Sequence, residues 1–168
     1  MGYADGLLGG AATSTADTVR PALQLIKAKP GNLAVSSCFL MTRDTRTLVM
    51  ADCSLNVDPD ADQLVEITLQ TARTARQFGI EPKIGLLSYS TYGSGSGESV
   101  NKVREAVVRL KRMPLDYEVD GEMQVDCALS PRVARLKAPQ SPIAGQVNTL
   151  IFPNIDAGNI GYKLVAQL

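Results

Sequence analysis

The stretch that most constrains the fold is a Gly- and Ser-rich segment, residues 88–98, between two apolar patterns. Before it, Lys83–Leu87 is a short apolar run of the kind that forms a buried strand, and after it apolar residues recur at helical spacing from Val100 to Leu110. The segment therefore joins the end of a strand to the start of a helix. Such a turn frees backbone N–H groups and directs them, together with the helix dipole, at a phosphate or carboxylate.

This geometry predicts an anion-binding loop whose donors come from Ser90, Thr91, Gly93 and Ser94. The loop matches neither GxxxxGK[ST] nor GxGxxG, so it carries no standard nucleotide fingerprint. A second interpretation stays equally open, in which Gly and Ser gather here only because a flexible connection tolerates them.

The rest of the chain alternates between strand and helix patterns. Residues 33–41 and 47–53 are two strand candidates joined by a short polar turn, which predicts a hairpin and therefore a mixed sheet. The strongest helix pattern has Asp58 as its cap and Pro59 as its first residue. Further strands are expected at 117–119, before a turn at 120–122, and at 147–152. We expect a three-layer αβα fold, in which ligands bind beyond the carboxyl ends of the strands.

Composition excludes several classes of function. The 17 basic and 17 acidic residues cancel, so nothing indicates a nucleic-acid partner, and no apolar run reaches the length of a membrane span. We expect a cytoplasmic protein. The absence of histidine excludes Ser-His-Asp and Cys-His nucleophiles and His-ligated zinc, unless another chain supplies the residue. The three cysteines are odd in number and widely spaced, which favours buried free thiols.

Two acidic clusters have a simple explanation besides a functional one. The aspartates at 52, 58, 60 and 62 follow strand-end and helix-start preferences, so no metal site is expected. Asp120, Glu122 and Asp126 could supply a general base, although acidic residues also favour helix starts for dipole reasons.

A second anion-facing helix start is predicted near the N-terminus. Ser14 or Thr13 is a candidate N-cap, Asp17 takes the position of a capping-box acid, and Thr15 and Arg20 lie close by. Hydroxyls and a guanidinium at a helix start can grip a phosphate. The alternative is that the hydroxyls only cap the helix and Arg20 is solvated.

Three segments taken together are much more specific: residues 14–24 (STADTVRPALQ), 87–91 (LSYST) and 152–163 (FPNIDAGNIGYK). With them the chain resembles the phosphate acetyltransferase (phosphotransacetylase) family from Tyr3 to Leu168. The resemblance implies reversible transfer of an acetyl group from acetyl-CoA to phosphate, giving acetyl phosphate and CoA, in a cleft between two α/β domains. Coenzyme A is then a substrate, with no tightly bound cofactor.

The resemblance also implies an organisation and a set of site residues. The fold would resemble that of isocitrate and isopropylmalate dehydrogenases and the full-length protein would form a homodimer. Residues 1–28 would be a remnant of the first domain, and residues 29–168 a second domain truncated at its C-terminus. Residues implied to contact the acyl phosphate or CoA, or to lie beside the cleft, are Ser14, Thr15, Arg20, Asn159, Tyr162 and Lys163. The family's catalytic Ser-Arg pair and aspartate fall beyond Leu168, so the catalytic residues stay unassigned.

Two other functions remain open within this resemblance. One is a relative that transfers butyryl or another acyl group. The other is a non-catalytic domain that binds acetyl-CoA as a regulator.

Overall fold

The computed structural model describes residue 6 and residues 8–28, 30–31 and 34–168. By their internal contacts the residues form two compact units, Met1–Asn32 and Leu33–Leu168. The expected boundary after residue 28 stays a prediction. Among the described residues, no helix has the length and the apolar character needed to cross a bilayer.

In the part of the smaller unit that the structure describes, the chain forms one helix, α1 (Thr15–Leu25). Of the two predicted N-cap candidates, Ser14 is the cap, in extended conformation, because its hydroxyl oxygen accepts a hydrogen bond from the Asp17 amide at 3.2 Å. The same hydroxyl donates to the Asp17 carboxylate at 2.7 Å. Residue types that satisfy the unpaired N–H groups of a first turn therefore fix where this helix begins.

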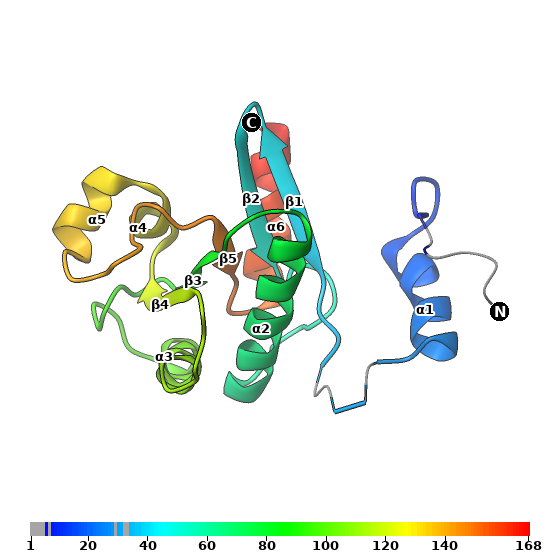
Figure 1. The fold of residues 1–168 in the computed structure, drawn as a ribbon, viewed down its shortest axis with the longest axis horizontal. Helices are drawn as coiled ribbons and strands as arrows, with labels where there is room; N and C mark the ends of the chain where they lie inside the picture. The colour runs from blue at the N-terminus through cyan, green and yellow to red at the C-terminus, as the bar shows by residue number, and fades with distance from the viewer. Residues whose placement is uncertain (1–5, 7, 29, 32–33) are drawn as a thin grey trace. The chain divides into compact units, whose positions relative to one another are not determined.

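The larger unit is built on a five-stranded sheet in the order β1-β2-β5-β3-β4 (Figure 1). The strands are β1 (Cys38–Arg43), β2 (Arg46–Ala51), β3 (Lys83–Leu87), β4 (Glu118–Met123) and β5 (Thr149–Ile151). β1 pairs with β2 in an antiparallel hairpin, whereas the other neighbouring strands are parallel. The predicted hairpin and mixed sheet are confirmed.

Helices cover both faces of this sheet (Figure 1). Successive strand residues point to opposite faces, so Ala51 and Ile151 belong to one apolar cluster while Met50 and Leu150 belong to another. The first cluster packs against α2 (Ala61–Gln77) and α3 (Glu98–Lys111). The second packs against α4 (Val125–Leu129), α5 (Pro131–Lys137) and α6 (Ile155–Gln167).

Two local predictions are wrong. The cap of α2 is Asp60, not Asp58, because Asp60 and Gln63 form a reciprocal capping box, and Pro59 precedes the helix. Residues 120–122 continue strand β4 instead of turning. Asp120 and Glu122 are buried there because each is paired with a cation from α3, so tertiary contacts override the low strand propensity of acidic residues.

All three cysteines are free thiols, and Cys53 and Cys127 are buried. Burial, together with the nearby Asp52 and Cys38, raises the pKa of Cys53 to about 12. A thiol so far from ionisation is a poor nucleophile, which favours a structural role.

Candidate functional site

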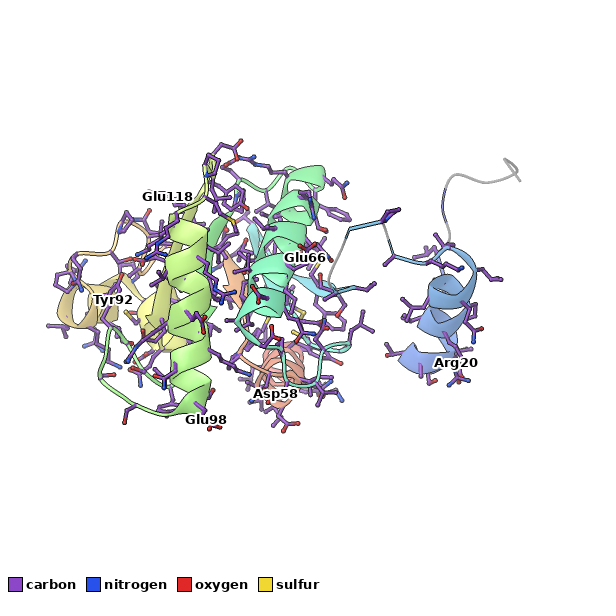
Figure 2. All side chains as sticks on the ribbon, turned by 90° about the horizontal axis from the view of Figure 1, so that it is seen from below. Arg20, Asp58, Glu66, Tyr92, Glu98 and Glu118 are labelled. Carbon is purple, nitrogen blue, oxygen red and sulfur yellow. The ribbon has the colours of Figure 1, made fainter. Side chains whose placement is uncertain are left out.

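The carboxyl ends of the central strands meet at one edge of the sheet. Ala51, Ile151 and Leu86 are in register across β2, β5 and β3, so the chain leaves these strands side by side. Helices α2, α3 and α6 begin at the same edge. Figure 2 shows Asp58 and Glu98 there, while Glu118, at the start of β4, lies at the opposite end. This edge is the expected location of a ligand in an α/β sheet.

One pocket at this edge, of about 350 Å³, is largely apolar and is termed the apolar pocket. Its walls come from the ends of β3 and β5, the Gly/Ser loop, and the starts of α3, α4 and α6. The lining residues are Leu87, Ser88, Tyr89, Ser99, Val125, Phe152, Pro153, Asn154 and Ala157. Its volume falls at the lower end for small-molecule sites, with a few polar groups placed to orient a ligand.

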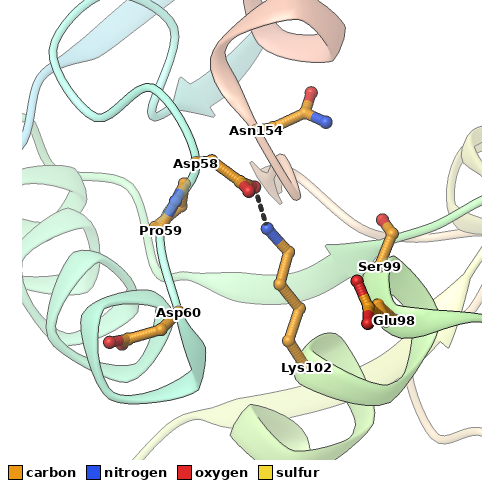
Figure 3. A pocket seen from close by; sticks show the side chains of 7 residues that line it. All are labelled: Asp58, Pro59, Asp60, Glu98, Ser99, Lys102 and Asn154. Atoms are coloured by element: carbon orange, nitrogen blue, oxygen red, sulfur yellow. Dashed lines mark hydrogen bonds and ion pairs between the residues drawn. The ribbon is translucent and has the colours of Figure 1, made fainter.

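A second pocket, of about 420 Å³, is termed the acidic pocket. It is lined by Asp58, Pro59, Asp60, Glu98, Ser99, Lys102 and Asn154. Lys102 pairs with Asp58 across it (Figure 3). Ser99 and Asn154 line both pockets, which therefore adjoin. Three carboxylates against one ammonium group make this pocket unfavourable for a phosphate.

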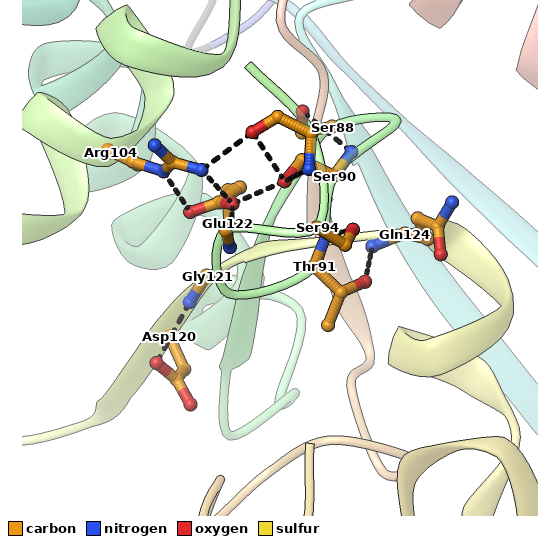
Figure 4. A network of polar contacts seen from close by, with 11 residues as sticks. Ser88, Ser90, Thr91, Ser94, Arg104, Asp120, Gly121, Glu122 and Gln124 are labelled. Atoms are coloured by element: carbon orange, nitrogen blue, oxygen red, sulfur yellow. Dashed lines mark hydrogen bonds and ion pairs between the residues drawn. The ribbon is translucent and has the colours of Figure 1, made fainter. Parts of the chain in front are cut away.

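In the Gly/Ser loop, residues 88–97, several hydrogen-bond donors are directed at acceptors of the protein itself (Figure 4). The Gly93 amide and the Ser90 hydroxyl donate to the Glu122 carboxylate at 2.9 and 2.7 Å. The Gly95 amide donates to Ser90 Oγ and the Thr91 amide to Ser94 Oγ, both at 2.9 Å. The loop thus holds an internal anion, and its binding of a ligand's phosphate stays a prediction.

The Glu122 carboxylate is also paired with Arg104 of α3, through Nε at 3.0 Å and Nη2 at 3.1 Å. Burial alone raises the pKa of this carboxyl group, but the hydrogen bonds from Arg104, Ser90 and the Gly93 amide outweigh burial and hold the pKa below its ordinary value. Glu122 is therefore a buried, ionised group at neutral pH. An acid so strongly stabilised in its charged form is a weak general base.

Asp120 forms a parallel network two residues earlier on β4. It accepts from Lys111 Nζ and Ser141 Oγ, both at 2.5 Å, and from the Tyr92 hydroxyl. Burial raises the pKa of Asp120, but these hydrogen bonds outweigh it and the pKa lies below its ordinary value. Asp120 is likewise a structural anion.

Of the three predicted residues of α6, Asn159 and Tyr162 contact the sheet side of the fold, whereas Lys163 is exposed. Asn159 Nδ2 donates to the carbonyl of Cys53, just after β2, at 3.2 Å. The Tyr162 ring stacks on Phe39 of β1 with centroids 4.1 Å apart, and Lys163 Nζ lies 6.0 Å from the Tyr162 ring. Within the described residues, none of the three lines either pocket at the sheet edge. Their assignment to substrate stays a prediction.

Ser14, Thr15 and Arg20 belong to the smaller unit. Ser14 and Thr15 lie together at the start of α1, and Arg20, five residues further along, is exposed. Their contact with a phosphate also stays a prediction.

Sequence reasoning missed Arg104 and the role of Glu122. The sequence contained a signal for this pairing of charges. Arg104 and Lys111 lie seven residues apart on one face of α3, and Asp120 and Glu122 lie two residues apart on β4. Among the residues that the structure covers, no group of three or more His, Cys, Asp or Glu side chains could hold a metal ion.

Comparison with known families gives one consistent result. The family model described as phosphate acetyl/butaryl transferase matches residues 1–168. The chain belongs to this family.

Individual relatives agree. The chain is 48% identical to the phosphate acetyltransferase of Bacillus subtilis over 99% of its length, which is 52% of that relative. It is also 48% identical to the phosphate acetyltransferase of Escherichia coli, over 97% of its length and 23% of that protein. The crystal structure of a phosphotransacetylase from Streptococcus pyogenes superposes with a TM-score of 0.91 at 51% identity, covering 99% of this chain and 51% of that one. This family member therefore spans about half of the Bacillus and Streptococcus proteins and a smaller part of the Escherichia coli protein.

Proposed function

We propose that the protein to which this chain belongs is a phosphate acetyltransferase, which transfers an acetyl group reversibly between coenzyme A and phosphate. The observation that carries the proposal is family membership over the whole chain, with nearly half of all positions identical in relatives of that name. The main alternatives, a butyryl-specific enzyme and a regulatory acetyl-CoA-binding domain, become outcomes of the test below.

Most of the kinds of chemical group that this reaction requires are present in this chain. In the direction that makes acetyl-CoA, the CoA thiolate attacks the carbonyl carbon of acetyl phosphate, a C–S bond forms, and the C–O bond to phosphate breaks. Hydrogen-bond donors must stabilise the oxygen anion that forms on the carbonyl, and a cation must stabilise the departing phosphate. Neither histidine nor metal is needed. The base that deprotonates the thiol is not assigned to any residue of this chain.

The phosphate contact is proposed for the smaller unit. The first N–H groups of α1 and the hydroxyls of Ser14 and Thr15 are suitable donors. A guanidinium such as that of Arg20 can hold two phosphate oxygens at once. The exposure of Arg20 leaves it available for such a contact.

The apolar pocket of the larger unit is proposed to receive the uncharged, amide-containing arm of acetyl-CoA that carries the thioester, termed the thioester arm. An acetyl group alone would leave much of a 350 Å³ pocket empty, whereas an extended arm with amide groups would fill more of it. Ser88, Ser99 and Asn154 offer polar partners to such amides. The three carboxylates of the neighbouring acidic pocket disfavour phosphate groups on that side.

The remaining expectations from the resemblance are part of the same proposal. The complete protein would adopt a fold of the isocitrate/isopropylmalate dehydrogenase type, form a homodimer, and serve acetate metabolism in the cytoplasm. Its partners would be acetyl-CoA, phosphate and acetyl phosphate, without nucleic acid or membrane.

The test is an assay of acetyl phosphate formation from acetyl-CoA and phosphate with the full-length protein. Turnover of acetyl-CoA faster than butyryl-CoA supports the proposal, and the reverse preference supports the butyryl enzyme. Binding of acetyl-CoA without turnover would establish the regulatory alternative instead.

Arg20→Ala tests the phosphate contact in the same assay. We expect kcat/KM for phosphate to fall by about 10- to 100-fold, as for a lost charge-assisted hydrogen bond of about 1.5–3 kcal/mol. Arg20→Lys is the matched control, because it keeps the charge but loses the bidentate contact. Its kcat/KM for phosphate should lie between those of the wild type and Arg20→Ala. Unchanged kinetics in Arg20→Ala would place this side chain in solvent.

A further inference from the structure

Glu122 joins three elements at a point that almost no solvent reaches. Its residue is 2% exposed, and its carboxylate accepts four hydrogen bonds, from Ser90 Oγ, the Gly93 amide and two nitrogens of Arg104. Arg104 Nη2 also donates to the Gly95 carbonyl at 2.9 Å. One carboxylate therefore ties strand β4 and helix α3 to the Gly/Ser loop (Figure 4).

The loop in turn determines where Tyr89 lies. A Cβ atom added at Gly95 would lie 2.8 Å from Tyr89 Cε2, and one added at Gly97 would lie 2.9 Å from its hydroxyl oxygen, so the ring rests on these two glycines. The hydroxyl donates to the Ser96 carbonyl at 2.6 Å, and Gln124 Nε2 donates to the Tyr89 carbonyl at 2.8 Å.

Tyr89 nevertheless remains 58% exposed and, with Ser88, forms one wall of the apolar pocket. An exposed aromatic ring held on a fixed backbone is a preorganised contact surface, and preorganisation reduces the entropy lost on binding.

We propose that Glu122 is a positioning residue: its buried carboxylate serves as a built-in anion that orders the Gly/Ser loop and thereby sets the Tyr89 wall of the apolar pocket for the thioester arm. The inference rests on the proposed function, since it takes acetyl-CoA as the occupant of that pocket. It assigns the Gly93 N–H group and the Ser90 hydroxyl to Glu122 and the loop's outer side to the substrate.

The first test is Glu122→Gln in the full-length protein. Glutamine is of similar size but places an NH₂ group against the donors of Arg104. We expect KM for acetyl-CoA to rise about 10-fold, equivalent to about 1.4 kcal/mol, while kcat and KM for phosphate change less than about twofold. A fall in kcat with KM for acetyl-CoA unchanged would overturn the proposal.

Asp120→Asn is the matched control. Asp120 is also buried on β4 and also paired with a cation of α3, Lys111, but it binds no backbone N–H group of the Gly/Ser loop. Asn keeps an acceptor for the Tyr92 hydroxyl. If the two variants lose similar stability, the proposal requires KM for acetyl-CoA to rise less in Asp120→Asn than in Glu122→Gln. Equal rises in KM would mean that both acids only stabilise the fold.

Two further variants separate positioning from folding. Ser90→Ala removes the hydroxyl that donates to Glu122 but leaves the charges of Glu122 and Arg104 in place. It should therefore also raise KM for acetyl-CoA, by a smaller factor than Glu122→Gln. Tyr89→Ala removes the wall itself, so adding Glu122→Gln to it should raise KM no further. Additive effects of these two substitutions would refute the link between them.

Amide hydrogen exchange supplies a readout that needs no catalysis. In Glu122→Gln, exchange in residues 88–97 should speed up, whereas in Asp120→Asn it should stay near the wild-type rate. Unchanged exchange of the loop in Glu122→Gln overturns the positioning role. If the wild-type protein forms no acetyl phosphate, the proposed function fails, while the exchange experiment still decides whether Glu122 orders the loop.

Discussion

Helix α6 approaches the end of β2 so closely that only a glycine fits at position 158. A Cβ atom there would lie 2.5 Å from the Asp52 carbonyl oxygen and 3.1 Å from Cys53 Cα, both backbone atoms. The backbone cannot yield easily, because the buried Asp52 carboxylate holds the amides of Ser54 at 2.8 Å and Leu55 at 3.1 Å. In Gly158→Ala, α6 must therefore shift outward.

Gly161→Ala, one helical turn later, is the matched control. Its Cβ would lie 3.1 Å from Cε1 of Phe152, a side-chain atom that can move by a few tenths of an ångström. Both substitutions gain about 1 kcal/mol of helix propensity. Only Gly158→Ala adds the overpacking cost of about 1–3 kcal/mol. We therefore expect Gly161→Ala to be neutral or slightly stabilising and Gly158→Ala to be about 2 kcal/mol less stable than it.

The measurement is urea unfolding of the full-length variants followed by circular dichroism, with the slope m compared to confirm that the denatured states are alike. Hydrogen exchange of α6 amides localises the effect, which should appear as faster exchange in Gly158→Ala alone. Equal unfolding midpoints for the two variants would refute the close approach of α6 to the end of β2.

Three further predictions concern caps, pH and thiols. Asp60→Ala should lower the free energy of unfolding by about 1 kcal/mol, because the N-cap of α2 is lost. Asp58 belongs to an exposed ion pair, so Asp58→Ala should change the free energy of unfolding by less than about 0.5 kcal/mol. The reverse order in urea unfolding would restore Asp58 as the cap. Because the folded pKa values of Glu122 and Asp120 are lowered, their ionisation adds stability above the ordinary pKa of about 4, and this stability is lost as pH falls through the folded values. The unfolding midpoint of wild type should therefore fall more steeply below about pH 4 than that of Glu122→Gln or Asp120→Asn, and parallel curves would contradict this. Cys53 should resist iodoacetamide at pH 8 in the native protein and react in urea, as read by mass spectrometry; rapid native labelling would contradict its raised pKa.

Local signals in the sequence predict most of the elements. The apolar run Lys83–Leu87 is strand β3, and Ser14 caps α1 because a hydroxyl at a helix start satisfies a backbone amide wherever it occurs. Such interactions span three or four residues and depend little on the remainder of the fold. The polar turn between the first two strands likewise predicts their antiparallel pairing.

Errors arise where distant residues decide. The acidic stretch at 120–122 has the composition of a turn, and it is a strand because Lys111 and Arg104 neutralise its carboxylates inside the fold. No rule of local propensity contains that information. The same holds for the two pockets, whose walls are brought together by strand order and not by nearness in the sequence.

The Gly/Ser loop shows that a strand-to-helix turn predicted from the sequence can hold an anion of the protein itself. The N–H groups of a strand-to-helix turn need an acceptor, which water, a phosphate or an internal carboxylate can supply. Here Glu122 lies 29 residues beyond Gly93 and is 2% exposed, so removing its donors would leave a buried charge at a cost of several kcal/mol. A ligand phosphate would have to displace a covalently attached carboxylate and leave Arg104 without its partner. The Gly93 amide and the Ser90 hydroxyl are thus occupied by Glu122, and the proposed contact with a substrate is made by Ser88 and Tyr89, which line the apolar pocket.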